Sequence, residues 1–479
     1  AFTLPFFEYP TVAPPSAPVD TFYPGASADV IAKCVAAPIE AGTGRSTPKM
    51  SYLGAFAFAA PRQGEGLTER PEVNTEFKGE ILPSDGAEIY LRRDLALSPV
   101  KAYIWEEVEG AKDGEFGKVV VKKDYRSGEP MTVKAGEQLV IDFGQNCAGV
   151  PEFVFQAEEG TQLTCAVAEL LNDGNGARSR GMDGPEGSVH RENLRIPATG
   201  MRLEYTFASD RPETYMPRHT FFGYRYLSVT ATDDVAFESV ASVPVSSVTR
   251  EMESGSIETG DGDLNRFISN VRWGQLSNYL SVPTDCPQRN ERLGWTADTQ
   301  VFAEAGAFNA DTSRFFRKWM RDLVDTQHEK GGFTGVAPLA QYGCDAMRLG
   351  WSDAGIVVPH VLYRMFGNTD ILKRHFAAMD RFMDVIAKDP IPKKPCPDFG
   401  DWLAYEGNGD ELRHLISQAY LVWDARMMVD VAKALGKTEA VKKYEAMDRK
   451  ASADFKAKYL GPDGLLMEKC RLQTGYAFA

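Results

Sequence analysis

The feature that most constrains the fold of this chain is a change in the spacing of its apolar residues near residue 260. Before this point, short runs such as residues 139–143 are rich in β-branched and aromatic side chains, as strands are. After it, apolar residues recur every three to four positions, as in Leu264, Phe267, Ile268 and Val271, which is the spacing of one helix face. The sequence therefore predicts β domains followed by a helical domain.

The helical part divides into segments separated by Gly, Pro and Asp, which are common at helix ends. Asp261 or Asp263 is available to cap the first segment. Since the segments share no fixed repeat length, a helical barrel or bundle is favoured over a repeat solenoid. We predict helices at residues 262–280, 297–308, 311–329, 352–366, 370–388, 411–435 and 437–459.

The preceding part contains short strand-like runs at residues 118–121, 139–143, 153–155, 163–167 and 224–229. Six prolines within the first 25 residues disfavour helix there and indicate an extended segment. We therefore predict three parts. A Pro-rich entry segment and an all-β domain occupy residues 1–130, a β-sandwich occupies residues 131–248, and the helical domain occupies residues 249–479.

Charge and composition exclude several classes of partner. The 479 residues carry a formal net charge of −14, which argues against nucleic acid or an anionic membrane surface, because both are bound through basic patches. No apolar run approaches the ~20 residues of a membrane span. The compartment stays open, because the sequence fits a cytoplasmic enzyme or a periplasmic or extracellular one whose signal peptide is absent from this chain.

The seven cysteines are scattered and form no Cys-x-x-Cys pair. We interpret them as isolated buried thiols rather than as disulfides or a zinc site. They are Cys34, Cys147, Cys165, Cys286, Cys344, Cys396 and Cys470.

The densest chemistry lies in residues 285–298, Asp-Cys-Pro-Gln-Arg-Asn-Glu-Arg-Leu-Gly-Trp-Thr-Ala-Asp. Carboxylates, guanidinium groups and an indole together suit a carbohydrate site. A glycosidic bond breaks when a carboxylic acid protonates the leaving oxygen while a second carboxylate activates water or attacks the sugar carbon.

Glu291 is the candidate proton donor of this stretch. Repulsion from Asp285 and Asp298 would raise its pKa, whereas Arg289 and Arg292 would lower it. The residue types alone equally allow an ion-pair cluster beside a helix start.

The stretch closely resembles the Asp-Cys-Pro-Gln-Arg-Asp-Glu-Arg-Leu-Gly-Trp-Thr-Gly-Asp signature of the bacterial α-L-rhamnosidases. This family of inverting glycoside hydrolases has an (α/α)6-barrel catalytic domain. Residues 141–149 and 222–226 also resemble the sandwich that precedes this barrel, where Asp-x-Gly-Gln-Asn-x-x-Gly and Gly-Phe-Arg-Tyr recur. Asn290 and Ala297 depart from the signature, and neither is a transferred site residue.

The resemblance implies roles for individual residues. Glu291 matches the general acid, and the residues that match the lining of the rhamnose subsite are Asp285, Arg289, Trp295 and Asp298. The segments Gly-Trp-Ser-Asp-Ala and Gly-Asp-Trp-Leu resemble further family segments, which transfers pocket roles to Trp351, Asp353 and Trp402. By residue type alone, buried Trp and helix-capping Asp explain these two segments as well. The family resemblance implies no metal and no cofactor.

An (α/α)6 barrel has twelve helices, and the sequence predicts seven. The last residues, Gln-Thr-Gly-Tyr-Ala-Phe-Ala, resemble the start of a further family helix. The family's general base, a Glu near a downstream Trp-Glu-Arg-Trp-like segment, has no match here. We therefore expect the barrel to be incomplete in this chain. A C-terminal segment, as a continuation, a cleaved chain or a partner, would complete it and supply the base.

These features together predict an inverting α-L-rhamnosidase that releases terminal rhamnose from a rhamnose-containing oligosaccharide or glycoside. Two alternatives remain. One is an (α/α)6 glycosidase specific for another sugar, and the other is a non-catalytic carbohydrate-binding relative.

Overall fold

The computed structural model describes residues 87–108, 116–173, 183–194, 201–289, 291–339, 349–388, 400–402 and 412–479. The described residues belong to two compact units. The sandwich unit contains those up to Glu251 together with Ile257–Ser281 and Cys286–Arg292. The helical unit contains Met252–Ser256, Val282–Asp285 and those from Leu293 onward. The predicted entry segment lies outside the described residues.

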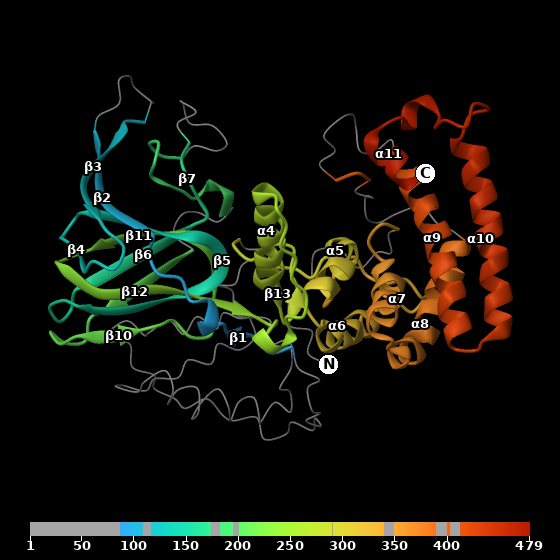
Figure 1. The fold of residues 1–479 in the computed structure, drawn as a ribbon, viewed down its shortest axis with the longest axis horizontal. Coiled ribbons are helices and arrows are strands. Elements are labelled where there is room, and N and C mark those ends of the chain that lie inside the picture. The colour runs from blue at the N-terminus through green and yellow to red at the C-terminus, as the bar shows by residue number, and fades with distance from the viewer. Residues whose placement is uncertain are drawn as a thin grey trace, which may run out of the picture. The chain divides into compact units, whose positions relative to one another are not determined.

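The sandwich unit is built around one long strand, β5 (Gln138–Gln156), at the centre of a ten-stranded antiparallel sheet (Figure 1). Its main path runs β1-β12-β5-β11-β6-β9, while β10 and β2 also pair with β5, β3 pairs with β2, and β4 pairs with β12. The other strands of this sheet are β1 (Tyr90–Leu91), β2 (Lys101–Val108), β3 (Lys118–Tyr125), β4 (Met131–Val133), β6 (Gln162–Ala168), β9 (Arg202–Thr206), β10 (Glu213–Tyr215), β11 (Phe222–Ala231) and β12 (Val235–Ser246). Two short pairs, β7 (Leu170–Leu171) with β8 (Val189–His190) and β13 (Tyr279–Leu280) with β14 (Val282–Pro283), lie outside it.

All five strand-like runs of the sequence lie in strands of this sheet, which confirms those predictions. Two of them, residues 139–143 and 153–155, belong to the single strand β5. The pairing of β5 with β11 shifts between Tyr224 and Tyr226, so that residues 143–146 of β5 bulge out of the ladder. The sheet also crosses the predicted boundary at residue 130, because β2 pairs directly with β5.

The bulge brings two predicted family segments into contact. Gly144 has a φ of 74°, and its N–H donates to the Asp142 Oδ1 atom at 2.7 Å. Arg225 of β11 forms two hydrogen bonds to the same carboxylate, at 2.7 and 2.8 Å. A bidentate pair of this kind fixes direction as well as distance, so it holds the bulge against β11.

The main core of the sandwich is aromatic. The Phe155 side chain is 1% exposed and its ring lies 4.6 Å from that of Phe207 and 5.5 Å from that of Phe153, between centroids. Tyr205 and Phe237 complete the cluster. Rings at these separations bury large apolar areas and attract one another further through their edges and faces.

Helix α4 (Gly262–Asn278) packs on the sandwich sheet. Asp261 accepts hydrogen bonds from the N–H groups of Asp263 and Leu264 and is therefore its N-cap. The Ser277 Oγ atom accepts from the Ala148 N–H at 3.0 Å. The helix thus lies where predicted, but it groups with the β domain rather than with the later helices.

The helical unit contains the remaining predicted helices, all confirmed to within a few residues (Figure 1). Helix α7 contacts four others, α5, α6, α8 and α9, and most of its side chains are buried. Helices α9 and α10 pack along one another and α11 contacts α9. These helices are α5 (Thr296–Asn309), α6 (Ser313–Asp325), α7 (Ala354–Phe366), α8 (Thr369–Lys388), α9 (Arg413–Ala434), α10 (Thr438–Tyr459) and α11 (Gln473–Phe478).

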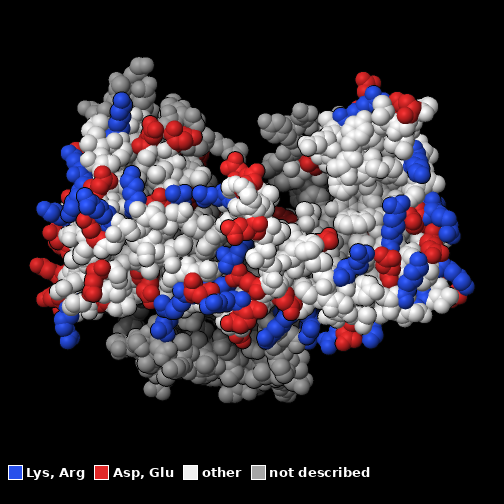
Figure 2. Space-filling model, viewed as in Figure 1, with Lys and Arg blue, Asp and Glu red and all other residues white. Residues whose placement is uncertain are grey.

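Charged side chains of both signs are interspersed over α10 on the face drawn in Figure 2. Several are paired, as in Lys443 with Asp380 and Asp384 of α8, at 2.6 and 2.7 Å. Among the described helices, none combines the length and the apolar character that a membrane crossing requires. The cysteines of the described part, Cys147, Cys165, Cys286 and Cys470, are buried and form no disulfide.

The aromatic core should dominate the stability of the sandwich. We expect Phe155→Ala to lower the free energy of unfolding by about 3–5 kcal/mol, because it removes a buried ring and leaves a cavity. Urea unfolding followed by circular dichroism measures this change. Val121 is 42% exposed, so Val121→Ala should cost less than about 0.5 kcal/mol. Equal midpoints for the two variants would contradict the assignment of this core.

Candidate active site

Asp285 and Leu293 close the base of the loop that carries Glu291. The Asp285 N–H donates to the Leu293 carbonyl oxygen at 3.0 Å, and the Leu293 N–H donates to the Asp285 Oδ1 atom at 2.9 Å. One oxygen of this predicted sugar-binding carboxylate thus also shapes the loop. Pro287 lies inside the loop, where its missing N–H and fixed φ oppose a helix.

The loop itself, Cys286–Arg292, belongs to the sandwich unit. The Arg292 Nη2 atom donates to the Phe221 carbonyl oxygen at 3.0 Å, and the guanidinium group lies 4.1 Å from the centroid of the Phe221 ring. Arg292 has a φ of 52°, a left-handed conformation that costs a non-glycine residue on the order of 1 kcal/mol or more. Its contacts with Phe221 offset this cost.

Gly223 of β11 lies directly against the loop backbone. A Cβ atom at this position would come within 2.7 Å of the Gln288 Cα atom and 2.8 Å of its nitrogen. Only glycine leaves room for the loop here, which explains the Gly of the Phe-Gly-Tyr-Arg-Tyr segment.

Arg289 and Glu291 form an ion pair inside the loop, with the Arg289 Nη2 atom 2.9 Å from the Glu291 Oε2 atom. Their side chains are 25% and 16% exposed, respectively. This pair brings the predicted acid and one predicted sugar-binding residue together. It favours the charged carboxylate, whereas a general acid must carry a proton.

Glu169 is a further carboxylate next to the loop that the sequence analysis did not single out. It lies between β6 and β7 and accepts hydrogen bonds from the side chains of Asn146, at 2.8 Å, and Asn193, at 3.0 Å. Burial raises the pKa of Glu169, and the two Asn side chains, Arg289 and Gln288 oppose that shift. The one feature of the sequence that could have pointed to Glu169 is its position, as a charged residue at the end of a largely apolar strand.

The second half of the motif lies in the helical unit. Gly294 and Trp295 run beside residues 335–337, with the Ala337 N–H donating to the Gly294 carbonyl at 2.9 Å. A Cβ atom at Gly294 would come within 2.1 Å of the Ala337 carbonyl oxygen. Trp295 then precedes α5, and Asp298 is exposed in the first turn of that helix, where a negative charge is favourable.

Trp351 and Asp353 lie in the turn before α7. Trp351 is half-buried, but Asp353 is fully buried and accepts a hydrogen bond from the Gly350 N–H. The carboxyl group of Asp424 of α9, which is also fully buried, lies close enough to influence that of Asp353. Burial, and then the proximity of Asp353, raise the pKa of Asp424 well above its usual value. The position of Asp353 favours a structural role over contact with a sugar.

Trp402 is 64% exposed. Its neighbour Asp401 accepts a hydrogen bond from the Thr474 hydroxyl at 2.7 Å. An exposed indole can stack on the C–H face of a sugar.

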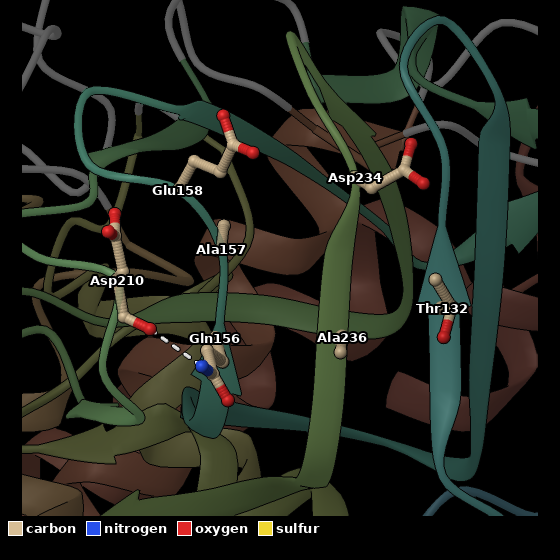
Figure 3. A pocket seen from close by; sticks show the side chains of 7 residues that line it. All are labelled: Thr132, Gln156, Ala157, Glu158, Asp210, Asp234 and Ala236. Carbon is tan, nitrogen blue, oxygen red and sulfur yellow. Dashed lines mark hydrogen bonds between the residues drawn. The ribbon is translucent and has the colours of Figure 1, made fainter.

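The sandwich also contains an open hollow of about 430 Å³, lined by Thr132, Gln156, Ala157, Glu158, Asp210, Asp234 and Ala236 (Figure 3). The hollow lies at the Gln156 end of β5. Ala148, the residue of β5 that pairs with Gly223, is eight residues away along the strand, which corresponds to roughly 25 Å. The Gln156 Nε2 atom donates to the Asp210 carbonyl at 2.6 Å, and the three carboxylates are spread around the rim (Figure 3). None of the predicted site residues lines this hollow.

Both parts of the chain match family models. Residues 116–246 match the bacterial α-L-rhamnosidase concanavalin-like domain, and residues 252–479 match the bacterial α-L-rhamnosidase 6 hairpin glycosidase domain.

Individual relatives agree with these matches. An α-L-rhamnosidase of Streptomyces avermitilis is 33% identical over 73% of this chain and 32% of its own length. One of Formosa agariphila is 30% identical over 72% of this chain and 36% of its own length. The crystal structure of the S. avermitilis α-L-rhamnosidase complexed with L-rhamnose has a TM-score of 0.66 and 28% identity, covering 84% of this chain and 34% of that one. The chain thus spans about a third of the length of these relatives.

The Asp353–Asp424 pair should make stability depend on pH. A carboxyl group with a pKa raised by folding binds its proton more tightly in the native state, so stability falls as pH rises above the ordinary value of about 3.9. The slope is at most about 1.4 kcal/mol per pH unit for one proton. We expect Asp424→Asn to reduce this loss, because an amide has nearly the same size as the carboxyl group and never ionises.

Urea unfolding at pH 5 and pH 8 tests this expectation. The difference in unfolding free energy between the two pH values should shrink in Asp424→Asn and stay at the wild-type value in Asp454→Asn, which alters an exposed carboxylate of α10. An unchanged difference in Asp424→Asn would show that the pair does not retain a proton.

Proposed function

Since the chain belongs to the bacterial α-L-rhamnosidase family, we propose that it hydrolyses terminal α-L-rhamnose from a rhamnose-containing oligosaccharide or glycoside. The observation that carries the proposal is the Cys286–Arg292 loop, because it presents a carboxylate and a guanidinium group together within a motif of this family. The S. avermitilis relative was crystallised with L-rhamnose, which supports the same sugar here.

Glu291 is the proposed general acid. It donates a proton to the glycosidic oxygen as the bond to the sugar carbon breaks, so that the aglycone leaves as a neutral alcohol. Because its ion pair with Arg289 favours the charged form, this proton must be retained against the pull of the guanidinium group. A sugar hydroxyl that accepts hydrogen bonds from Arg289 would weaken that pull.

An inverting reaction also needs a base. A second carboxylate, roughly 6.5–9.5 Å from the first, activates a water molecule on the opposite face of the sugar. We assign no residue of this chain to that role. The length of the relatives, about three times the part that this chain spans, supports a base from a segment outside these 479 residues. The same segment would complete an (α/α)6 barrel with helices α5 to α11.

The proposed sugar-binding residues each bring suitable chemistry. Carboxylates and guanidinium groups hydrogen bond to hydroxyls, and indoles stack on the apolar face of the ring. Asp353 is left out of this set because it is fully buried. The set is Asp285, Arg289, Trp295, Asp298, Trp351 and Trp402.

Dependence on the leaving group tests the role of Glu291 most sharply. A general acid matters most when the departing alcohol is a poor leaving group, because that oxygen needs its proton earlier. We expect Glu291→Gln to reduce kcat/KM for an alkyl α-L-rhamnoside by about 10³-fold or more. The loss for a nitrophenyl α-L-rhamnoside should be at least about tenfold smaller.

The matched control is Glu258→Gln, at an exposed glutamate outside the loop, which should leave both rates unchanged. Equal losses on the two substrates would assign Glu291 to binding rather than to proton transfer. Binding of rhamnose without any hydrolysis by the complete assembly, including the segment that supplies the base, would instead favour the non-catalytic carbohydrate-binding alternative.

A further inference from the structure

The sandwich provides a shaped surface for the loop that carries Glu291. We call this surface the loop seat and define it by Asn146, Glu169, Asn193, Phe221 and Gly223. Phe221 accepts the Arg292 guanidinium group, and Gly223 admits the backbone of the loop at Gln288. Both are residues of the sheet or its immediate edge, so the loop rests on a rigid element.

Glu169 is the only carboxylate of the loop seat, and its own position is fixed. Its Oε1 atom accepts from the Asn146 side chain at 2.8 Å and its Oε2 atom from the Asn193 side chain at 3.0 Å. Asn146 belongs to the bulge of β5, and Asn193 to the short 3-10 helix Glu192–Leu194. Two amide donors from separate segments thus hold the two oxygens, which leaves this carboxylate little rotational freedom.

The fixed carboxylate faces the loop through two neighbouring side chains. Gln288, which lies directly against Gly223, and Arg289 are both close enough to Glu169 to favour its charged form. Arg289 in turn contacts Glu291 at 2.9 Å. The guanidinium group of Arg289 is therefore attracted by two carboxylates, that of Glu169 in the sandwich and that of Glu291 in the loop.

We propose that Glu169 is a positioning residue, which holds Gln288 and Arg289 on the loop seat and thereby sets the place and the charge environment of Glu291. This inference rests on the proposed function only for the role of Glu291 as an acid. Its structural part, that Glu169 holds the loop, stands independently of that role.

The two carboxylates compete for the positive charge of Arg289. While Glu169 is ionised, it offsets part of the field that Arg289 exerts on Glu291. Without that negative charge, less of the field of Arg289 is offset at Glu291, which favours the ionised form of Glu291. The general acid would then lose its proton at a lower pH, and the rate would decline earlier on the alkaline side of the pH profile.

The first test compares pH profiles. We expect Glu169→Gln, which keeps the size of the side chain and removes its charge, to shift the alkaline limb of kcat/KM for an alkyl rhamnoside down by about 0.5–1 pH unit. We also expect kcat to fall roughly tenfold with KM changed less than about threefold. Glu158→Gln, at an exposed glutamate of the same unit, should match the wild type. If the alkaline limb of the kcat/KM profile is the same in Glu169→Gln as in the wild type, the electrostatic part of the proposal is overturned.

The second test needs no activity. Amide hydrogen exchange of peptides covering residues 284–294 should be about tenfold faster or more in Glu169→Ala, because the loop loses its anchor. Peptides covering residues 150–156 of β5 should exchange as in the wild type and show that the sandwich is folded. Gly223→Ala should give the same pattern, because its Cβ atom displaces the backbone at Gln288.

The two measurements separate the two proposals. If the wild-type protein, together with the segment that supplies the base, cleaves no rhamnoside, the proposed function fails, and hydrogen exchange still decides whether Glu169 holds the loop. Unchanged exchange of residues 284–294 in Glu169→Ala would reject the positioning role whether or not the protein is active. If amide exchange in Glu169→Ala is faster throughout the sandwich, that variant is not properly folded. Glu169→Gln is then used in its place in the same comparison.

Discussion

The interaction on which the rest of the site depends is the contact of the Cys286–Arg292 loop with the sandwich. A loop of seven residues that contains a proline and a residue with a φ of 52° has little local structure to stabilise it. Arg292 on Phe221, Gln288 on Gly223 and the bonds between Asp285 and Leu293 supply that stability instead. A general acid, the role proposed for Glu291, must be held to a fraction of an ångström for proton transfer, and these contacts hold the loop that carries Glu291.

Several motif residues therefore act by shape rather than by chemistry. Gly223 and Gly294 are needed because another backbone passes where their Cβ atoms would be. Asp142 and Arg225 join the two sandwich segments through a bidentate salt bridge. With Arg225 37% exposed, this bridge adds only about 1 kcal/mol to stability, but it fixes the bulge from which Asn146 reaches Glu169.

Much of the fold followed from the sequence. The seven predicted helices were placed to within a few residues and the five strand-like runs all lie in strands, because the spacing of apolar residues reflects directly which face is buried. Strands β2, β9 and β12 were not predicted individually. The bulge at residues 143–146 was not predicted, since it depends on pairing with β11 some 80 residues later. For the same reason, periodicity placed α4 in the helical series and gave no indication that it packs on a sheet.

The site was predictable in part. The motif identified Glu291 and Arg289, and the structure places the two in contact. Their neighbour Glu169 lies more than 100 residues away in the chain, so no local pattern reveals it. Asp353 shows the opposite case: its Trp-x-Asp setting suited a sugar pocket, but its side chain is fully buried and accepts a hydrogen bond from the Gly350 N–H.

The most direct test of the central claim is a crystal structure of the protein with bound L-rhamnose. The account predicts that the Glu291 carboxyl group lies within hydrogen-bonding distance of the anomeric oxygen, with the loop still on Phe221 and Gly223. Rhamnose bound elsewhere, or bound with Glu291 directed away from the anomeric carbon, would contradict it.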